Sequence, residues 1–174
     1  TLVEAKGSVR RGIQMVETAC GMPTLLMGEH FEDIAPGIDC KAVNRPMGVF
    51  GVIAPFNFPA MVPLWFMPYA IATGNTFVLK PSERVPMTQL KLFELWDKVG
   101  LPKGVINIIN GAGGRIGKYL STHELVKKVG FTGETTTGQL IMQYATENII
   151  PSTLELGGKS PNIFLESIMD ADDE

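Results

Sequence analysis

Five short apolar runs alternate with helix-patterned segments from residue 48 onward, and this alternation restricts the fold more than any other feature. The runs are GVFGVIA (48–54), TFVLK (76–80), VINII (105–109), VKKVGF (126–131) and STLEL (152–156). Strands this apolar are typical of a parallel sheet buried on both faces. Regular alternation of strands with helices indicates a doubly wound α/β fold. The sequence therefore predicts a Rossmann-like parallel sheet with helices on both of its faces.

Helix-patterned segments are expected at 9–20, 60–73, 87–99, 115–120 and 135–146. In the first of these, Ile13, Val16 and Ala19 share one face. In the third, the inward side chains are expected to be Leu92, Leu95, Trp96 and Val99. The segment 21–45 has a looser pattern, and its alternation in IDCKAVNRP predicts extended strands or a hairpin outside the core.

Composition excludes several classes of function. The chain has 174 residues, a net charge of −3 and no Lys/Arg-rich run, which argues against a nucleic-acid surface. Two cysteines, Cys20 and Cys40, form neither a disulfide framework nor a metal-ligand spacing, and neither is a good nucleophile candidate. Two distant histidines predict no metal site. A reduced setting, cytoplasmic or in an organelle matrix, fits this composition best, and the cytoplasm is the expected location.

One uncharged stretch, residues 46–79, is long enough to imitate a transmembrane helix. It contains five prolines, and each proline inside a helix removes a hydrogen bond and clashes with the preceding turn, at about 3 kcal/mol. A buried strand, a turn and a short buried helix are therefore predicted instead, and no membrane partner is expected.

Polar clusters follow four of the predicted strands: PFNFP (55–59), KPSE (80–83), NGAGG (110–114) and TGETTTG (132–138). Ligands of such folds bind beyond the carboxyl ends of the strands, so this shared placement predicts a binding crevice. Lys80 and Glu83 could grip a ribose or form an incidental surface pair. The two glycine-bearing loops could hold phosphate or be ordinary tight turns. Asn57 could donate to an oxyanion or cap a helix.

Glu155 stands between Leu154 and Leu156 in an apolar run, where a buried carboxylate needs a partner or a chemical role. Burial raises the pKa of a carboxyl group towards neutrality, which suits a general base. The alternative is a structural carboxylate bonded to backbone amides. Two glycines follow, Gly157 and Gly158, and they let another backbone or a ligand come close, which favours the functional interpretation.

Taken together, PFNFP, GNTFVLKPSE, GLPKGVINIINGAGG, VGFTGETTTG and LELGGKSPNIF resemble the aldehyde dehydrogenase superfamily, in its order and near its spacing. The resemblance covers nearly the whole chain from Val9 and implies an internal segment of a longer enzyme. It implies a helical part of the cofactor domain at 1–25 and an oligomerisation-type hairpin at 26–46. The NAD(P)-binding domain would span 47–156, and a catalytic domain would begin at 157–174.

The resemblance also implies roles for single residues. Lys80 and Glu83 would hold the adenosine ribose, and Gly111 would pack near the adenine. Gly133 and Glu134 would face the pyrophosphate. Asn57 would stabilise an oxyanion, and Glu155 would activate the water that hydrolyses a cysteine thioester. The nicotinamide side would be lined by Ile53, Ala54, Phe56 and Leu156, and further cofactor-site positions are Pro55, Ser82, Thr137 and Gly157.

Three departures qualify the resemblance. The nucleophilic cysteine of the family follows Glu155 in a later segment, beyond Glu174, so this segment should be inactive alone. The position after FTG is usually a serine, whereas here it is Glu134. Residues 37–86 resemble methylmalonate-semialdehyde dehydrogenases, which acylate coenzyme A, whereas residues 131–164 resemble acetaldehyde-type enzymes.

The sequence thus predicts a segment of an NAD(P)-dependent aldehyde dehydrogenase that oxidises a small-molecule aldehyde to its acid and forms homo-oligomers at full length. A coenzyme A-acylating semialdehyde dehydrogenase is the first alternative. A truncated, non-catalytic dinucleotide-binding module is the second. NAD is expected as the cofactor because the Glu83 carboxylate would repel the 2′-phosphate of NADP. NADP is the alternative cofactor.

Overall fold

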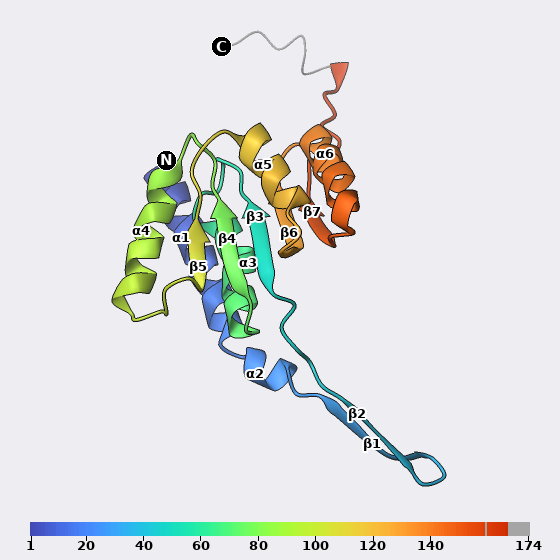
Figure 1. Ribbon diagram of the computed structural model, residues 1–174. Coiled ribbons are helices and arrows are strands. Elements are labelled where there is room, and N and C mark those ends of the chain that lie inside the picture. Colours follow the sequence, from blue (N-terminus) through green and yellow to red (C-terminus); the bar gives the residue numbers. More distant parts are fainter. Residues whose placement is uncertain (159, 167–174) are drawn as a thin grey trace.

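A five-stranded parallel sheet forms the centre of the molecule in the computed structural model, which describes residues 1–158 and 160–166 (Figure 1). Its strand order is β5-β4-β3-β6-β7. The strands are β3 (Val49–Ile53), β4 (Thr76–Lys80), β5 (Ile106–Ile108), β6 (Val126–Thr132) and β7 (Ser152–Glu155). Neighbouring strands all pair in parallel. The predicted α/β class and sheet are confirmed, and all five strands lie within the predicted runs to within one residue.

Helices cover both faces of this sheet. On one face lie α3 (Met61–Ala72) and α4 (Pro86–Lys98), and α1 (Leu2–Ala19) packs on α3. On the other face lie α5 (Gly113–Thr122) and α6 (Thr135–Ala145), which runs into the short 3₁₀ helix η1 (Thr146–Asn148). Each crossover from one parallel strand to the next therefore contains a helix, as parallel pairing requires.

The sheet separates two apolar cores, because successive side chains of a strand point to opposite faces. Val52 packs with Met67 and Phe77 beneath α3 and α4. Its neighbour Ile53 packs with Phe131 and other side chains beneath α5 and α6. This alternation explains why the strand sequences are apolar at nearly every position.

A hairpin projects away from the sheet (Figure 1). After the short helix α2 (Met22–Leu25), β1 (Glu29–Ala35) pairs antiparallel with β2 (Ile38–Ala42). The tight turn places Gly37 at φ 72°, and its amide donates to Asp33 Oδ1 at 2.8 Å. The expected hairpin is confirmed within 21–45, whereas α2 is too short for a helical period to reveal it in the sequence.

Helix α1 corrects two sequence expectations. It begins at Leu2 rather than Val9, because Thr1 and Glu4 form a capping box at its start. Ile13 is 50% exposed, and the buried positions of α1 are Ser8, Gly12 and Ala19. The small side chains face α3 because the two helices approach closely at Gly12, where a Cβ would lie 2.5 Å from Cδ1 of Leu64.

Helix α4 corrects a third expectation. The sequence places Leu95 and Val99 on the inward face, yet both are exposed. The apolar side chains that reach the core from this helix are Phe93 and Trp96. The helix lies at the β5 edge of the sheet, so the sheet covers only a narrow stripe of it (Figure 1).

The uncharged stretch folds as expected into strand β3, a turn and the buried helix α3. Its polar side chain Asn75 is buried, and its Oδ1 accepts from the amides of Met47 at 2.7 Å and Gly48 at 2.9 Å. In the part of the chain that the structure describes, no helix is long and apolar enough to cross a membrane.

Candidate functional site

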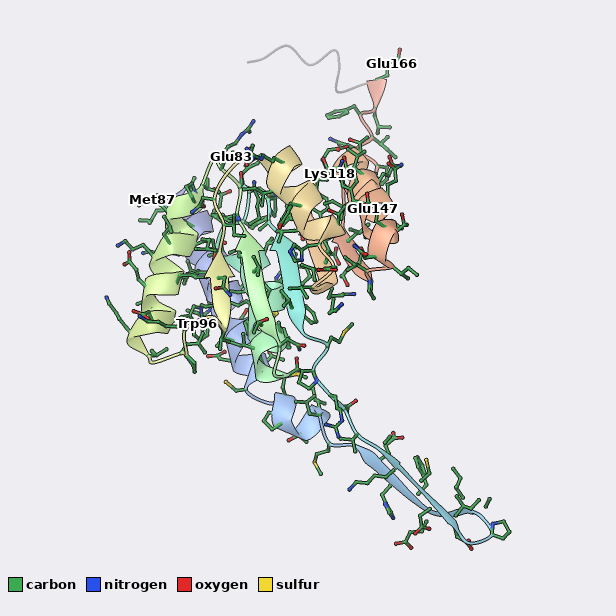
Figure 2. The ribbon with its side chains drawn as sticks, in the orientation of Figure 1. Glu83, Met87, Trp96, Lys118, Glu147 and Glu166 are labelled. Carbon is green, nitrogen blue, oxygen red and sulfur yellow. The ribbon has the colours of Figure 1, made fainter. Side chains whose placement is uncertain are left out.

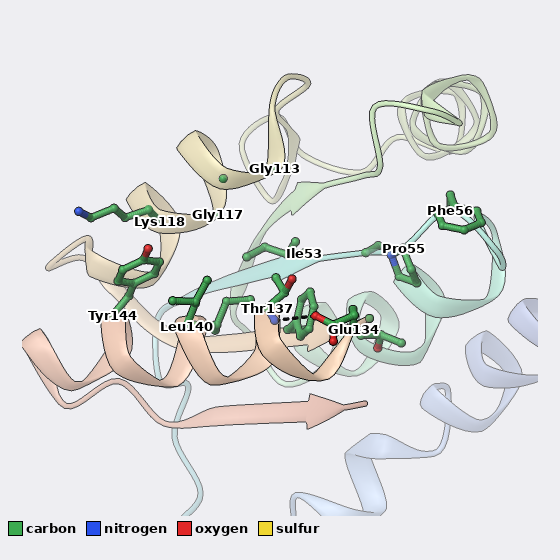
Figure 3. Close-up of a pocket in the computed structure, with 16 residues that line it drawn as sticks. Ile53, Pro55, Phe56, Gly113, Gly117, Lys118, Glu134, Thr137, Leu140 and Tyr144 are labelled. Carbon is green, nitrogen blue, oxygen red and sulfur yellow. Dashed lines mark hydrogen bonds between the residues drawn. The ribbon is translucent and has the colours of Figure 1, made fainter. Parts of the chain in front are cut away.

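A cavity of about 390 Å³ opens at the carboxyl ends of β3 and β6, between α5 and α6 (Figure 3). In sequence order the five strands of the sheet read 3-2-1-4-5, so the chain reverses direction between β3 and β6. This reversal is the topological switch point at which doubly wound folds bind their ligands. The sequence-predicted crevice thus corresponds to a real cavity.

Seven of the residues that the sequence assigned to the cofactor site line this cavity. They come from the end of β3 and the loop after it, and from the turn between β6 and α6 together with the first turn of α6. They are Ile53, Ala54, Pro55, Phe56, Gly133, Glu134 and Thr137. The carboxyl ends of β3 and β6 therefore meet as expected, because parallel strands end at the same edge.

Two helix faces complete the cavity, and sequence reasoning found only the start of the first, since Gly113 belongs to the NGAGG cluster (110–114). Gly113 and Gly117 lie four residues apart on one face of α5 and leave its backbone bare there. Leu140, Ile141 and Tyr144 supply the facing surface of α6. Lys118 also lines the cavity, and its Nζ lies 5.3 Å from the Tyr144 ring centroid (Figure 3). The i, i+4 spacing of these glycines was the available signal.

Lys80 and Glu83 form an ion pair at the end of β4, with 2.7 Å between Nζ and Oε2. The lysine side chain is 3% exposed, whereas the glutamate side chain is 56% exposed. The hydrogen bond from Lys80 holds the pKa of the Glu83 carboxyl below its usual value of 4.5. A Cβ on Gly113 would lie 3.6 Å from this Nζ, which places the pair next to the start of α5 and the rim of the cavity.

Glu134 is the N-cap of α6. Its Oε2 accepts from the Thr137 amide at 3.0 Å and from the Thr136 hydroxyl. Hydrogen bonds from Thr136 and from backbone amides lower the pKa of this carboxyl group. The departure from the usual serine therefore places an ionised carboxylate on the helix N-terminus that borders the cavity.

The turn between β6 and α6 brings bare backbone to the cavity. A Cβ on Gly133 would lie 2.6 Å from the Phe131 ring, so only glycine fits there without rearrangement. Thr132 Oγ1 is buried and has no hydrogen-bond partner among the described residues, although Thr132 lines the cavity. A buried polar atom of this kind is suited to a ligand that supplies the missing hydrogen bond.

Glu155 lies at the end of β7, next to the cavity-lining turn, because the Gly133 amide donates to its carbonyl oxygen at 3.0 Å. The expectation that its side chain is buried is wrong for this structure, since Glu155 is exposed. The reason is topological: β7 is the edge strand of the sheet. Leu156 and Gly157 follow against α6, where a Cβ on Gly138 would lie 2.5 Å from Leu156 Cδ2.

Asn57 lies in the exposed turn between β3 and α3, and it borders a separate hollow next to α1. It does not cap α3, whose N-cap is Ala60. The turn is held from two sides: Ser8 Oγ accepts from the Met61 amide at 3.3 Å, and Gln89 Nε2 donates to the Pro59 carbonyl.

Two further predicted positions lie outside the lining of the main cavity. Ser82 Oγ accepts from the Arg84 amide at 3.3 Å in the turn after β4. Gly111 has φ 144°, and a Cβ there would lie 2.7 Å from Ile116 Cδ1. Glycine is therefore required at this turn, which leads into α5.

A doubly wound sheet with a cavity at its switch point is the arrangement of the nucleotide-binding α/β proteins. The family model for the aldehyde dehydrogenase family matches residues 1–174, and the chain belongs to that family. It is 49% identical over 162 residues to malonate-semialdehyde dehydrogenase 3 of Bacillus cereus, covering 93% of this chain and 33% of the relative.

Two further comparisons give the same family. Aldehyde dehydrogenase B of Escherichia coli (strain K12) is 55% identical over 130 residues, which cover 75% of this chain and 25% of that protein. A point mutant of betaine aldehyde dehydrogenase from Staphylococcus aureus, solved in complex with NAD⁺, superposes with a TM-score of 0.88 at 40% identity. That match covers 93% of this chain and 33% of the solved chain. The chain thus spans about a third of the length of the relatives it matches.

Proposed function

We propose that this chain is the cofactor-binding part of an NAD(P)-dependent aldehyde dehydrogenase that oxidises an aldehyde to a carboxylic acid. The observation that carries the proposal is the cavity at the switch point, bounded by bare glycine backbone on α5 and by the N-terminus of α6. Its volume of about 390 Å³ lies in the range of small-molecule sites.

The lining residues fit a dinucleotide. The apolar surface of Leu140, Ile141 and Tyr144 suits a flat base, and the bare turn at Gly133 suits a phosphate that approaches the backbone. The pair Lys80–Glu83, with Ser82 in the same turn, would hold ribose hydroxyls. The bound cofactor would accept hydride from the aldehyde carbon. Near the nicotinamide end we place Ile53, Ala54, Pro55, Phe56, Leu156 and Gly157.

NAD is the proposed cofactor rather than NADP. The Glu83 carboxylate is ionised because the Lys80 hydrogen bond lowers its pKa, and it would repel a 2′-phosphate on the same ribose. Since Lys80 is already paired with Glu83, its charge is not free to compensate. The ratio of the dissociation constants for NADH and NADPH tests this assignment, and tighter binding of NADPH would contradict it.

Asn57 and Glu155 are the proposed catalytic residues. Asn57 stands in an exposed turn whose neighbouring backbone is held by Ser8 and Gln89, and its amide would donate to an oxyanion. Glu155 is the proposed base that takes a proton from the water attacking a cysteine thioester. Its place beside Gly133 sets it at the edge of the cofactor cavity.

A cavity-filling variant tests the binding proposal on this chain. Gly114 lines the cavity, and a Cβ there meets no atom within 4 Å, so Gly114→Phe should fold normally and fill the space. Titration followed by NADH fluorescence should show binding by the parent chain and at least tenfold weaker binding by the variant. Gly7→Phe is the matched control, since Gly7 also has open space around it but lies on α1. Equal affinity in all three proteins would refute the cavity as the cofactor site.

Glu155→Gln tests the catalytic proposal in the enzyme of full family length. Steady turnover should fall by roughly two to four orders of magnitude because a general base is lost. A first burst of NADH, about one per active site, should survive because the thioester still forms. Unchanged steady turnover without coenzyme A would remove Glu155 from the mechanism.

The same assay decides between the two enzyme branches. Several relatives are malonate-semialdehyde dehydrogenases, and the segment 37–86 resembles coenzyme A-acylating enzymes. If the parent enzyme requires coenzyme A for turnover, the thiol of coenzyme A releases the acyl group and Glu155 is dispensable. Turnover in water alone supports release of the free acid.

We also infer the organisation of the longer protein. Residues 1–25 and 47–156 would form the cofactor domain, and the hairpin segment 26–46 would join copies into a homo-oligomer, since Phe31, Ile34 and Ile38 are exposed on it. The catalytic domain would begin at 157–174, of which residue 159 and residues 167–174 lie outside the described part. The two free, exposed cysteines support a cytoplasmic setting.

A further inference from the structure

Glu134 occupies the place that the proposed function reserves for the cofactor pyrophosphate. It borders the cavity at the N-terminus of α6, on the same turn as the bare Gly133 backbone (Figure 3). A negatively charged side chain satisfies a helix N-terminus as a phosphate does, because both accept from the free amides there. The donors at the N-terminus of α6 therefore have two candidate acceptors, the Glu134 carboxylate and the cofactor pyrophosphate.

A single carboxylate oxygen takes two of these donors. Oε2 of Glu134 accepts from the Thr137 amide at 3.0 Å and also from the Thr136 hydroxyl. A phosphate oxygen at this turn would need the same two groups, and two anions would lie in contact. Among the lining residues, Lys118 carries the opposite charge, and its ammonium lies against the Tyr144 ring.

We propose that Glu134 is a built-in competitor for the cofactor pyrophosphate, which must displace its carboxylate from the α6 N-terminus before it can bind. This inference rests on the proposed function, because it assumes that the crevice takes a dinucleotide. The apparent affinity for the cofactor then equals the intrinsic affinity multiplied by the fraction of molecules in which the carboxylate has moved away. Glu134 acts as an affinity-determining residue and takes no part in the chemical step.

The first experiment titrates NADH into the 174-residue chain and into Glu134→Ser. Serine keeps a side chain that can cap the helix but removes the charge and shortens the reach. The dissociation constant should fall roughly tenfold in the variant. Glu147→Ser makes the same change of net charge at the exposed carboxylate beyond the other end of α6, and it should leave the constant unchanged (Figure 2). An equal or higher constant in Glu134→Ser would overturn the proposal.

A second variant controls for the loss of the helix cap, which could itself change the binding of NADH. Glu134→Gln keeps the length and one acceptor oxygen but removes the charge, so its dissociation constant should lie between those of the parent and Glu134→Ser. Circular dichroism of the free proteins reports whether α6 is retained. Weaker NADH binding by Glu134→Gln, with helix content unchanged, would mean that the carboxylate assists the ligand, and this would overturn the proposal.

A third arm uses inorganic pyrophosphate and the NMR signals of the Thr136 and Thr137 amides. These signals should shift at lower pyrophosphate concentration in Glu134→Ser than in the parent. If this difference appears while no protein binds NADH, the competitor role stands and the dinucleotide assignment fails. If NADH binds the parent and the variant equally, the dinucleotide assignment stands and the competitor role fails. If neither ligand perturbs either protein, both proposals fail.

Discussion

Lys80 is almost completely buried, yet its ammonium group ends on a carboxylate that is largely exposed to solvent. Burying an ammonium is costly unless a partner compensates for the lost hydration. Glu83 lies in the turn directly after β4, where Pro81 and Ser82 shape the backbone. Its Oε2 provides that compensation, 2.7 Å from the Nζ of Lys80. The pair therefore fixes the turn that lies beside the start of α5, in addition to any contact with a ribose.

Glu83→Gln should lower the free energy of unfolding by about 1 kcal/mol at pH 7, because the buried ammonium loses its charged partner while solvent screens the exposed side. The folded-state pKa of Glu83 is lowered, so the stabilisation is present above its usual value of 4.5 and is lost as the pH falls through the lowered value. Chemical denaturation at several pH values measures this.

The control for this pair is Glu94→Gln, which removes an ion pair exposed on both sides and should change stability little. The difference in the free energy of unfolding between the parent and Glu83→Gln should narrow below pH 4.5. It should disappear once Glu83 is protonated in the folded parent. A difference that stays constant down to about pH 3, well below the usual range of a glutamate, would show that the ion pair is not its cause.

At the scale of secondary structure, the contact between α1 and α3 depends on small residues. Gly12 is buried in α1 against Leu64 of α3, and Ser8 one turn earlier accepts from the Met61 amide at the start of α3. The two helices can approach closely because neither position carries a large side chain. This contact also holds the turn that carries Asn57, and none of the residues of α1 lines the cavity at the switch point.

Gly12→Leu should destabilise the protein by about 1–3 kcal/mol, because the new side chain overfills a packed interface against Leu64. Gly7→Leu on the same helix meets open space and should be neutral or stabilising by up to about 1 kcal/mol, as helix propensity predicts. Thermal unfolding of the two variants measures the difference. Equal melting temperatures would contradict the close approach of α1 and α3.

At the scale of the whole molecule, the residues proposed for binding and catalysis lie at one end of the sheet, where its parallel strands end. Lys80 and Glu155 are the last residues of β4 and β7. Asn57 and Glu134 lie in the turns that follow β3 and β6. The cysteines lie elsewhere: Cys20 ends α1, and Cys40 stands in the hairpin strand β2. Both are exposed, and neither lines the cavity at the switch point.

The purified 174-residue chain should therefore form no NADH from an aldehyde, although it should bind NADH. A thioester requires a thiol beside the cofactor cavity, and Cys20 and Cys40 are not placed there. A double variant, Cys20→Ala with Cys40→Ala, should behave as the parent does in both assays. Aldehyde-dependent NADH formation that either single substitution abolishes would overturn this assignment, whereas absent NADH binding would count against the cofactor domain itself.

Local sequence patterns were sufficient to predict the sheet, its strands and the edge at which polar groups gather. Strand runs such as TFVLK are apolar because both faces are covered, and this pattern can be recognised without knowledge of the neighbouring strands. The clusters that follow these strands share one edge because parallel strands end on the same side. Family motifs added the expected roles of Lys80, Asn57 and Glu155, which stay predictions.

Which side chains are covered, in contrast, could be learned only from the packing of the elements. Glu155 has an apolar sequence context but stands on the edge strand, so it is exposed. Leu95 and Val99 follow a helical period, yet both are exposed, and the apolar side chains of α4 that pack on the core are Phe93 and Trp96. The facing surfaces of α5 and α6, which enclose the cavity, likewise depend on how distant elements pack. Burial depends on a residue's neighbours in space, and a periodic pattern reports only its neighbours in sequence.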